Sequence, residues 1–173
     1  AGGVGSSGAV RLDIATNAHD ESRAVAVQAD GRIVLGVQAR LGGVFKHALA
    51  RLNADLTLDT TFGNGGLMVQ SFAVGGDFVR AVAVQPDGRI VSAGLTRPSA
   101  TQTSEIDDFL LTRHLADGSL DGSFGQGGKV VVDFFDSSDG AEALALQPDG
   151  KIVAGGLARS GTTNGLGVVR VLP

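Results

Sequence analysis

One glycine-rich stretch of the sequence has the spacing of a phosphate-binding turn. GVGSSG, from Gly3 to Gly8, follows the G-x-G-x-x-G pattern that holds a dinucleotide pyrophosphate at the start of a helix. That chemistry requires a helix directly after the glycines. The residues that follow, AVRLDIA, alternate between apolar and polar side chains as a β-strand does. The stretch therefore predicts a glycine turn that enters a strand, and no cofactor is expected.

Closely spaced aspartates in DGSLDGSFG (117–125) suggest a calcium loop. An EF-hand loop needs a glutamate at its twelfth position, and Gly128 stands there, which excludes an EF-hand. A looser site that uses Asp117, Asp121 and backbone carbonyls stays open as a weak metal candidate. Two other acidic stretches are expected to be solvated loops, with metal binding as the weaker alternative: EIDD (105–108) and FDSSD (135–139).

Paired Arg and Asp residues recur with one spacing. Arg51 and Asp59 are matched by Arg113 and Asp121 in a second copy of the same block. A repeated Arg–Asp pair across a loop is predicted to be a structural clamp, and an anion-binding site is the alternative. Arg170 stands at the third such position without a matching acid in its own stretch.

Histidines and serines offer little for catalysis. His19, His47 and His114 do not repeat and lack metal-ligand spacing such as H-x-H or H-E-x-x-H, so surface or edge positions are expected. No serine stands in a G-x-S-x-G turn. A Ser/His/Asp triad assembled from distant residues stays open, because spacing does not reveal it. No catalytic residue is predicted.

Internal repeats supply the elements that must position these residues. The stretch ESRAVAVQADGRIVLG recurs as DFVRAVAVQPDGRIVSAG and as AEALALQPDGKIVAGG. In each copy, two apolar runs flank a turn whose Asp and Gly favour a β-hairpin. The predicted structural turn residues are Asp30 and Gly31, Asp87 and Gly88, and Asp149 and Gly150.

A second repeated block indicates that the repeats are circularly permuted. ALARLNADLTLDTTFGNGGLMVQSF (48–72) recurs as LLTRHLADGSLDGSFGQGGKVVVDF (110–134). The third copy begins in GVVRVLP at the carboxyl end and continues in VGSSGAVRLDI at the amino end. We expect one domain over 1–173, with repeats at 19–76, 77–139, and 140–173 completed by 1–18. Each repeat predicts four short antiparallel strands, which make one blade of an all-β β-propeller.

The repeat resembles the delta-60 repeat of bacterial β-propellers, a repeat of unassigned function. The resemblance lies in A-V-Q-P-D-G-[RK]-I-V and in A-R-L-N-A-D-x-x-L-D-x-x-F-G-x-G-G, and it covers essentially the whole chain. The departures are Ala29 for Pro, Leu56 for Gly and Val4 for Phe. The resemblance implies a propeller and supplies no catalytic residue.

Three blades do not close a ring, because propellers typically have about four to eight blades. Ala9–Ala15 is predicted to be an outer strand without its own blade, and residues 141–173 a blade without its outer strand. We expect a homodimer in which two copies exchange these strands and form a six-bladed ring. The alternative is a fragment of a longer polypeptide, or an engineered propeller with no native ligand.

The amino-acid composition limits the classes of partner that this protein is expected to bind. The net charge of −4 and the scattered arginines argue against a nucleic-acid partner. No apolar run is long enough for a membrane span, and the absence of Cys excludes disulfides and thiolate sites. We expect a bacterial extracellular or cell-surface module that binds a protein or a glycan without catalysis. A hydrolase or lyase with its site at the channel mouth is the alternative.

Overall fold

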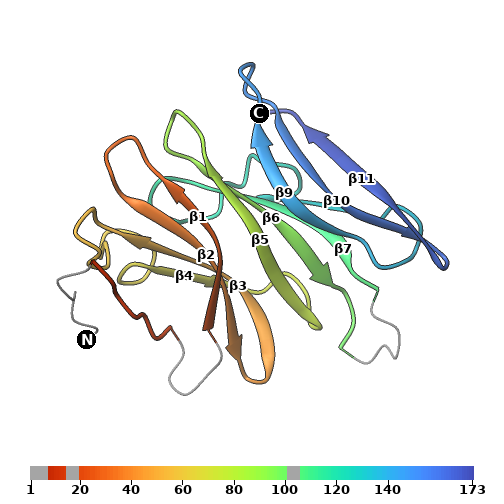
Figure 1. Cartoon of the computed structure of the whole chain (residues 1–173), viewed down its shortest axis with the longest axis horizontal. Coiled ribbons are helices and arrows are strands. Elements are labelled where there is room, and N and C mark those ends of the chain that lie inside the picture. The colour runs from red at the N-terminus through yellow and green to blue at the C-terminus, as the bar shows by residue number, and fades with distance from the viewer. Residues whose placement is uncertain (1–7, 15–19, 101–105) are drawn as a thin grey trace.

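Three antiparallel β-sheets lie side by side along the molecule (Figure 1). The computed structural model describes residues 8–14, 20–100 and 106–173, and these residues contain no helix, hence none that could cross a membrane. We call the sheets blades 1 to 3. Blade 1 holds β1 (Asp20–Val27), β2 (Ile33–Leu41), β3 (Val44–Leu52) and β4 (Leu67–Gln70); blade 2 holds β5 (Gly76–Val84), β6 (Ile90–Arg97), β7 (Asp108–His114) and β8 (Lys129–Val132); blade 3 holds β9 (Gly140–Leu146), β10 (Ile152–Ser160) and β11 (Thr163–Val171). The predicted all-β architecture is confirmed.

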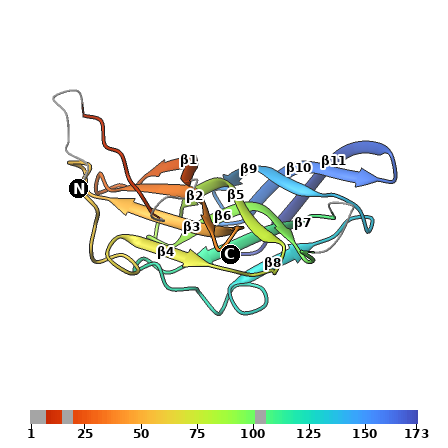
Figure 2. The same ribbon diagram turned by 90° about the horizontal axis from the view of Figure 1, so that it is seen from below.

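Within each blade, strands that follow one another in the chain are hydrogen-bonded neighbours. The first strands, β1, β5 and β9, lie on one side of the molecule, and the outer strands β4 and β8 lie on the opposite side (Figure 2). Blade 3 has three strands among the described residues, so its last strand, β11, has no outer neighbour there.

The first hairpin of each blade closes through the repeated Asp-Gly turn. Gly31 has a φ of 85°, and Gly88 and Gly150 have nearly the same value. In blade 1, Asp30 Oδ1 accepts a hydrogen bond from the backbone N–H of Arg32 at 3.0 Å. A glycine is needed here because a side chain rarely adopts this left-handed conformation.

Apolar side chains of each first strand fill the junction with the preceding blade. Val82 and Val84 on β5 pack against a buried cluster formed by Val34, Leu49, Phe62 and Ile90. At the junction of blades 2 and 3, Leu144 and Leu146 on β9 take the same positions. The same two side chains of the repeat therefore join one blade to the next at both junctions.

The strand predicted at Ala9–Ala15 does not join a sheet in the single chain. Residues 8–14 form no β-ladder with a described residue, and Ala15 lies outside the described residues. The segment lies beside blade 1, on the side away from blade 2 (Figure 1). Leu12 and Ile14 pack against an apolar cluster on β2 and β3. The third strand of blade 1, β3, pairs with β4.

Candidate functional site

The repeated Arg and Asp residues form buried ion pairs. Arg51 Nε donates to Asp59 Oδ2 at 2.8 Å, and the guanidinium lies over the ring of Phe62, 4.6 Å from its centroid. The same arrangement in blade 2, at 2.8 Å and 4.7 Å, consists of Arg113, Asp121 and Phe124. Each pair thus ties the third strand of its blade to the long loop that leads to the fourth.

A second arginine from the first hairpin binds the same carboxylate. Arg32 Nη1 lies 3.2 Å from Asp59 Oδ2, and its Nη2 pairs with Asp30 at 2.5 Å. Donation from the Thr61 hydroxyl, and then from these guanidinium groups, holds the pKa of Asp59 well below its usual range. Among the described residues of this site, Arg32 and Arg51 are thus both paired with carboxylates.

The two aspartates weighed as calcium ligands serve turns of the backbone. Asp117 Oδ1 accepts hydrogen bonds from the N–H and hydroxyl of Ser119 at 2.8 and 2.6 Å. Asp121 Oδ1 does the same for Ser123, and its other oxygen pairs with Arg113. Among the described residues, no three His, Asp or Glu side chains are grouped as a metal site.

The acidic stretches were expected to be solvated, and for three of their aspartates this is wrong. Asp107, Asp108 and Asp139 are all buried. Asp107 forms a two-pronged ion pair with Arg97 at 2.8 and 3.1 Å. Burial, followed by the nearby Asp133 and Asp139, raises the pKa of Asp108 to about 6. The fold brings the two stretches together across blades 2 and 3, which their separation in the sequence did not indicate.

The expected surface positions of two histidines are also wrong, because His47 and His114 are fully buried. His47 Nε2 lies 2.6 Å from Ser92 Oγ, and Thr112 Oγ1 lies 2.7 Å from that oxygen and 3.1 Å from His114 Nε2. The two imidazoles are stacked with centroids 5.6 Å apart. His19 lies outside the described residues. A neutral hydrogen-bond network is thus buried between blades 1 and 2.

This network lacks the features of a catalytic triad. Ser92 is buried and closed to a substrate, and His47 Nδ1 has no hydrogen-bond partner, so no carboxylate orients the ring. Burial lowers the pKa of His47 to about 3, with a further contribution from His114, and burial lowers the pKa of His114 to about 4. Both rings are therefore neutral at physiological pH and fill positions that Phe109 and Leu52 take in other repeats.

Three aspartates tie the start of each blade to the segment before it, a role that the sequence reasoning did not assign to them. We call Asp20, Asp77 and Asp139 the inter-blade aspartates. The Oδ2 atom of each accepts a backbone N–H at 2.7 Å from the segment that precedes its blade, and the donors are Ile14, Phe72 and Phe134. The sequence does contain a pattern that could have identified them. Each inter-blade aspartate precedes the repeated glutamine (Gln28, Gln85 or Gln147) by the same number of residues.

Removal of one inter-blade aspartate is expected to loosen its junction. Asp77 is fully buried and also accepts a hydrogen bond from Thr96 Oγ1 at 2.7 Å. Asp77→Ala should lower the free energy of unfolding by about 2–3 kcal/mol, because hydrogen bonds to a buried charged group are lost. Urea denaturation measures this, with the exposed Asp55→Ala as a control that should lose less than about 1 kcal/mol. Equal losses in the two variants would contradict the role of Asp77.

The two ends of the row of blades expose side chains that are covered at the internal junctions. Val27 is 68% exposed on β1, whereas its counterpart Val84 packs into the junction of blades 1 and 2. At the other end Val168 on β11 is 65% exposed, whereas its counterpart Leu49 is buried. These surfaces lie at opposite ends of the molecule (Figure 1), so one chain cannot bring them together.

The repeats match a family model described as "Domain of unknown function (DUF5122) beta-propeller". The matched residues are 28–62, 85–124 and 147–173, together more than half of the chain. The chain belongs to this family. The DUF5122 beta-propeller match begins in each repeat at the repeated glutamine and contains the Asp-Gly turn of the first hairpin. No curated protein matches the chain.

Proposed function

We propose that two copies of this DUF5122 beta-propeller close a six-bladed ring, which serves as a non-enzymatic binding or scaffold module at the bacterial cell surface or outside the cell. The delta-60 repeat remains the best description of its blades. The observation that carries the proposal is the bond from Ile14 to Asp20, which repeats the bonds that follow β4 and β8. This bond supports residues 8–14 as the counterpart of an outer strand, while β11 has no outer neighbour among the described residues.

The register of the proposed exchange follows from the repeat. In blade 1, β3 pairs with β4 through His47↔Gln70, Ala48↔Val69, Leu49↔Met68 and Ala50↔Leu67. The alignment transfers this register to β11 of one copy and the amino-terminal segment of the other. The expected pairs are Leu166↔Leu12, Gly167↔Arg11, Val168↔Val10 and Val169↔Ala9. Such pairing would supply hydrogen-bond partners to the backbone N–H and C=O groups on the open edge of β11. An open strand edge otherwise promotes aggregation.

The exposed valines supply the apolar part of the same interface. Val82 and Val84 pack on the Leu49 face of blade 1, so Val25 and Val27 of one copy are expected to pack on the Val168 face of the other. Two copies form two such contacts and leave no end uncovered, which is the condition for a closed ring. Six blades lie within the usual range for propellers.

A binding role is favoured over catalysis because the repeated charged groups are engaged in structural pairs. Arg51 and Asp59, and their counterparts in blade 2, are buried and bonded to each other. The described histidines are buried and neutral. A hydrolase or lyase would require acids or histidines that converge at one end of the channel, and no observation favours that arrangement.

Light scattering after size exclusion tests the ring. We expect a mass of twice 17.4 kDa. Val27→Asp should give the single-chain mass, because a charge would be buried unpaired in the interface. Val74→Asp is the matched control, since Val74 is equally exposed at 68% but lies in the linker between blades. A single-chain mass for the unchanged protein, or a dimer that persists in Val27→Asp, would refute the proposal.

A further inference from the structure

One arginine recurs near the end of the second strand in all three blades. Arg40, Arg97 and Arg159 stand at equivalent positions of the repeat, just before the loop that joins the second strand to the third. These loops differ in length and in sequence from blade to blade. The arginine is therefore shared by the blades, whereas the residues that follow it are not.

Blade 2 shows which group this arginine binds. Arg97 Nε and Nη2 donate to the two carboxylate oxygens of Asp107 at 2.8 and 3.1 Å. A guanidinium and a carboxylate fit together through two parallel bonds because both groups are planar. Asp107 belongs to the long loop before β7, so the carboxylate is carried by a segment of polypeptide.

In blades 1 and 3 the equivalent arginine has no such acid. The short loops that follow it contain none: LGGV (41–44) and SGTT (160–163). Arg40 Nε donates to Gly43 O at 3.1 Å, and Arg159 Nε donates to Gly161 O at 3.0 Å. Neither arginine forms an ion pair with a described residue, and their Nη atoms donate no hydrogen bond to one. Both residues are exposed, so these donors are open to solvent.

Local contacts already hold the Arg40 side chain in place. Its guanidinium lies over the ring of Phe45, 5.7 Å from the centroid, and the bond to Gly43 fixes its Nε side. The edge formed by the two Nη atoms is left for a ligand. Lys46 lies on the same hairpin, and residues 33–52 contain no Asp or Glu. The second hairpin of blade 1 is thus positively charged, which favours an anionic partner.

The nearest acid to Arg159 does not take the place of a ligand. Asp139 Oδ1 accepts the backbone N–H of Arg159 at 2.8 Å, and its Oδ2 accepts that of Phe134 at 2.7 Å. The Arg159 guanidinium is left unpaired, but a negative charge lies close to it. We therefore expect Arg40 to bind an anion more tightly than Arg159 does.

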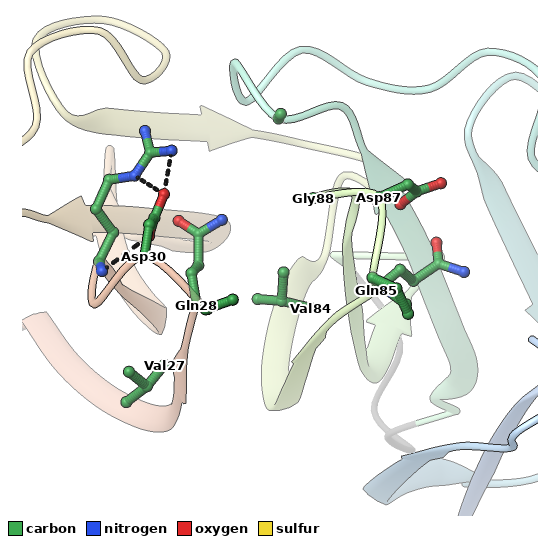
Figure 3. Close-up of a pocket in the computed structure, with 11 residues that line it drawn as sticks. Val27, Gln28, Asp30, Val84, Gln85, Asp87 and Gly88 are labelled. Atoms are coloured by element: carbon green, nitrogen blue, oxygen red, sulfur yellow. Dashed lines mark hydrogen bonds and ion pairs between the residues drawn. The ribbon is translucent and has the colours of Figure 1, made fainter.

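The basic residues at the opposite end of the same strands are not available to a ligand. Arg32, Arg89 and Lys151 each pair with the aspartate of the adjoining Asp-Gly turn. Figure 3 shows this contact at Asp30, beside the cavity between the first hairpins of blades 1 and 2. Of these two repeated basic positions, only the one before the second hairpin presents unpaired guanidinium groups in the part of the chain that the structure describes.

We propose that Arg40 and Arg159 bind carboxylate groups of an acidic protein segment, as Arg97 binds Asp107. The inference rests on the binding role proposed above and names its partner class. Each guanidinium donates from its two Nη atoms to the oxygens of one Asp or Glu side chain. An acidic protein segment is favoured over an acidic glycan because the group that fills this position in blade 2 is the side chain of a loop residue.

NMR titration with an acetylated, amidated peptide of six aspartates tests this site. We expect the Nε–Hε signals of Arg40 and Arg159 to shift, and that of Arg40 to saturate at the lower peptide concentration. The corresponding peptide of six asparagines should cause no shift, because it has no carboxylate. An oligogalacturonate of six units should bind at least about threefold more weakly, because its carboxylates are fixed to rigid rings and do not all reach the Nη edge of a guanidinium.

Double variants separate the site from the net charge. Arg40→Gln with Arg159→Gln should weaken binding of the aspartate peptide at least about tenfold. Arg23→Gln with Lys151→Gln is the matched control, because it removes the same charge from two cations that already form ion pairs. Its affinity for the peptide should fall by less than about twofold, since distant exposed charges are screened by salt.

A second pair of substitutions keeps the charge and changes the shape of the donor. Arg40→Lys with Arg159→Lys should weaken binding at least about threefold, because an ammonium group does not form the two parallel bonds of a guanidinium. Undiminished affinity in this variant would show that no two-bond contact is made.

Four further results would overturn the inference: no shift with the aspartate peptide, equal shifts with the asparagine peptide, tighter binding of the oligogalacturonate, or equal losses in the glutamine variant and its control. Light scattering on the same samples reports ring closure independently. A dimer that does not bind the peptide refutes this site alone, and a single chain that binds it refutes only the ring.

Discussion

Acidification from pH 6.5 toward pH 4 is expected to destabilise the fold through His47 and His114. The pKa of each falls from an ordinary value of 6.5 to about 3 and about 4 on burial, so the unfolded chain binds protons that the folded chain does not. The stabilisation is therefore complete above pH 6.5 and is lost as the pH falls. Each histidine contributes a slope of about 1.4 kcal/mol per pH unit. Neither ring has a carboxylate partner that would stabilise its protonated form.

Asp108 opposes this effect over part of the range. Its pKa rises from 3.8 to about 6, so between these values the folded chain binds the extra proton and stability increases as the pH falls. Below pH 6 the net loss should therefore equal the slope of about one histidine, roughly 1.4 kcal/mol per pH unit. Asp108→Asn removes the opposing group and should double the net slope.

Urea denaturation between pH 6.5 and pH 4.5 measures these slopes. The matched variant is His47→Phe with His114→Leu, which places at both positions the residue found in another repeat. Its stability should no longer fall in acid and should rise below pH 6 by about 1.4 kcal/mol per pH unit, because only Asp108 still titrates in this way. A double variant with the same slope as the unchanged protein would show that the buried histidines do not cause the acid sensitivity.

Gly94→Ala is expected to prevent folding or to cost at least about 4 kcal/mol. A Cβ atom at Gly94 would lie well under 3.0 Å from the backbone oxygen of Phe78 and close to the backbone N of Arg80. Gly94 pairs with Val79 next to the irregularity in β5, so neither strand can move without loss of the register. The cause is the close approach of two backbones, which no rotamer change relieves.

Gly122→Ala is the control, since a Cβ there meets no atom within 4 Å. We expect a change in the free energy of unfolding within about 0.5 kcal/mol. Soluble yield and urea denaturation distinguish the two variants. A Gly94→Ala protein as stable as Gly122→Ala would contradict the packing of β5 against β6.

Local signals explain why much of the fold was predictable. The Asp-Gly turns, such as Asp87 and Gly88, act within a few residues, and alternation of apolar side chains marks the strands beside them. Repetition made each signal visible three times. The Arg51 and Asp59 pair could be located in the same way, because its two members stand at one spacing in two repeats.

Burial and pairing depend on the neighbouring blade, which is why other predictions were wrong. His47 looks like a surface residue until β6 places Ser92 at 2.6 Å from its ring. Asp107 and Asp139 look like solvated acids until β7 and the loop before β9 meet, with Asp139 N–H donating to Asp107 O at 2.6 Å. The free-energy cost of burying a polar group depends on the atoms that surround it in the fold. The sequence alone does not show which atoms those are.

The sequence by itself determined that this protein is a row of three β-blades, because strands and hairpin turns arise from short-range backbone preferences that the repeats display. Only the tertiary structure decided which polar groups are hidden, which blades the inter-blade aspartates join, and which edge and which guanidinium groups lack a partner among the described residues. Those properties arise where segments distant in the sequence come into contact. The free energy of such a contact depends on both of the residues that form it, so neither segment alone determines it.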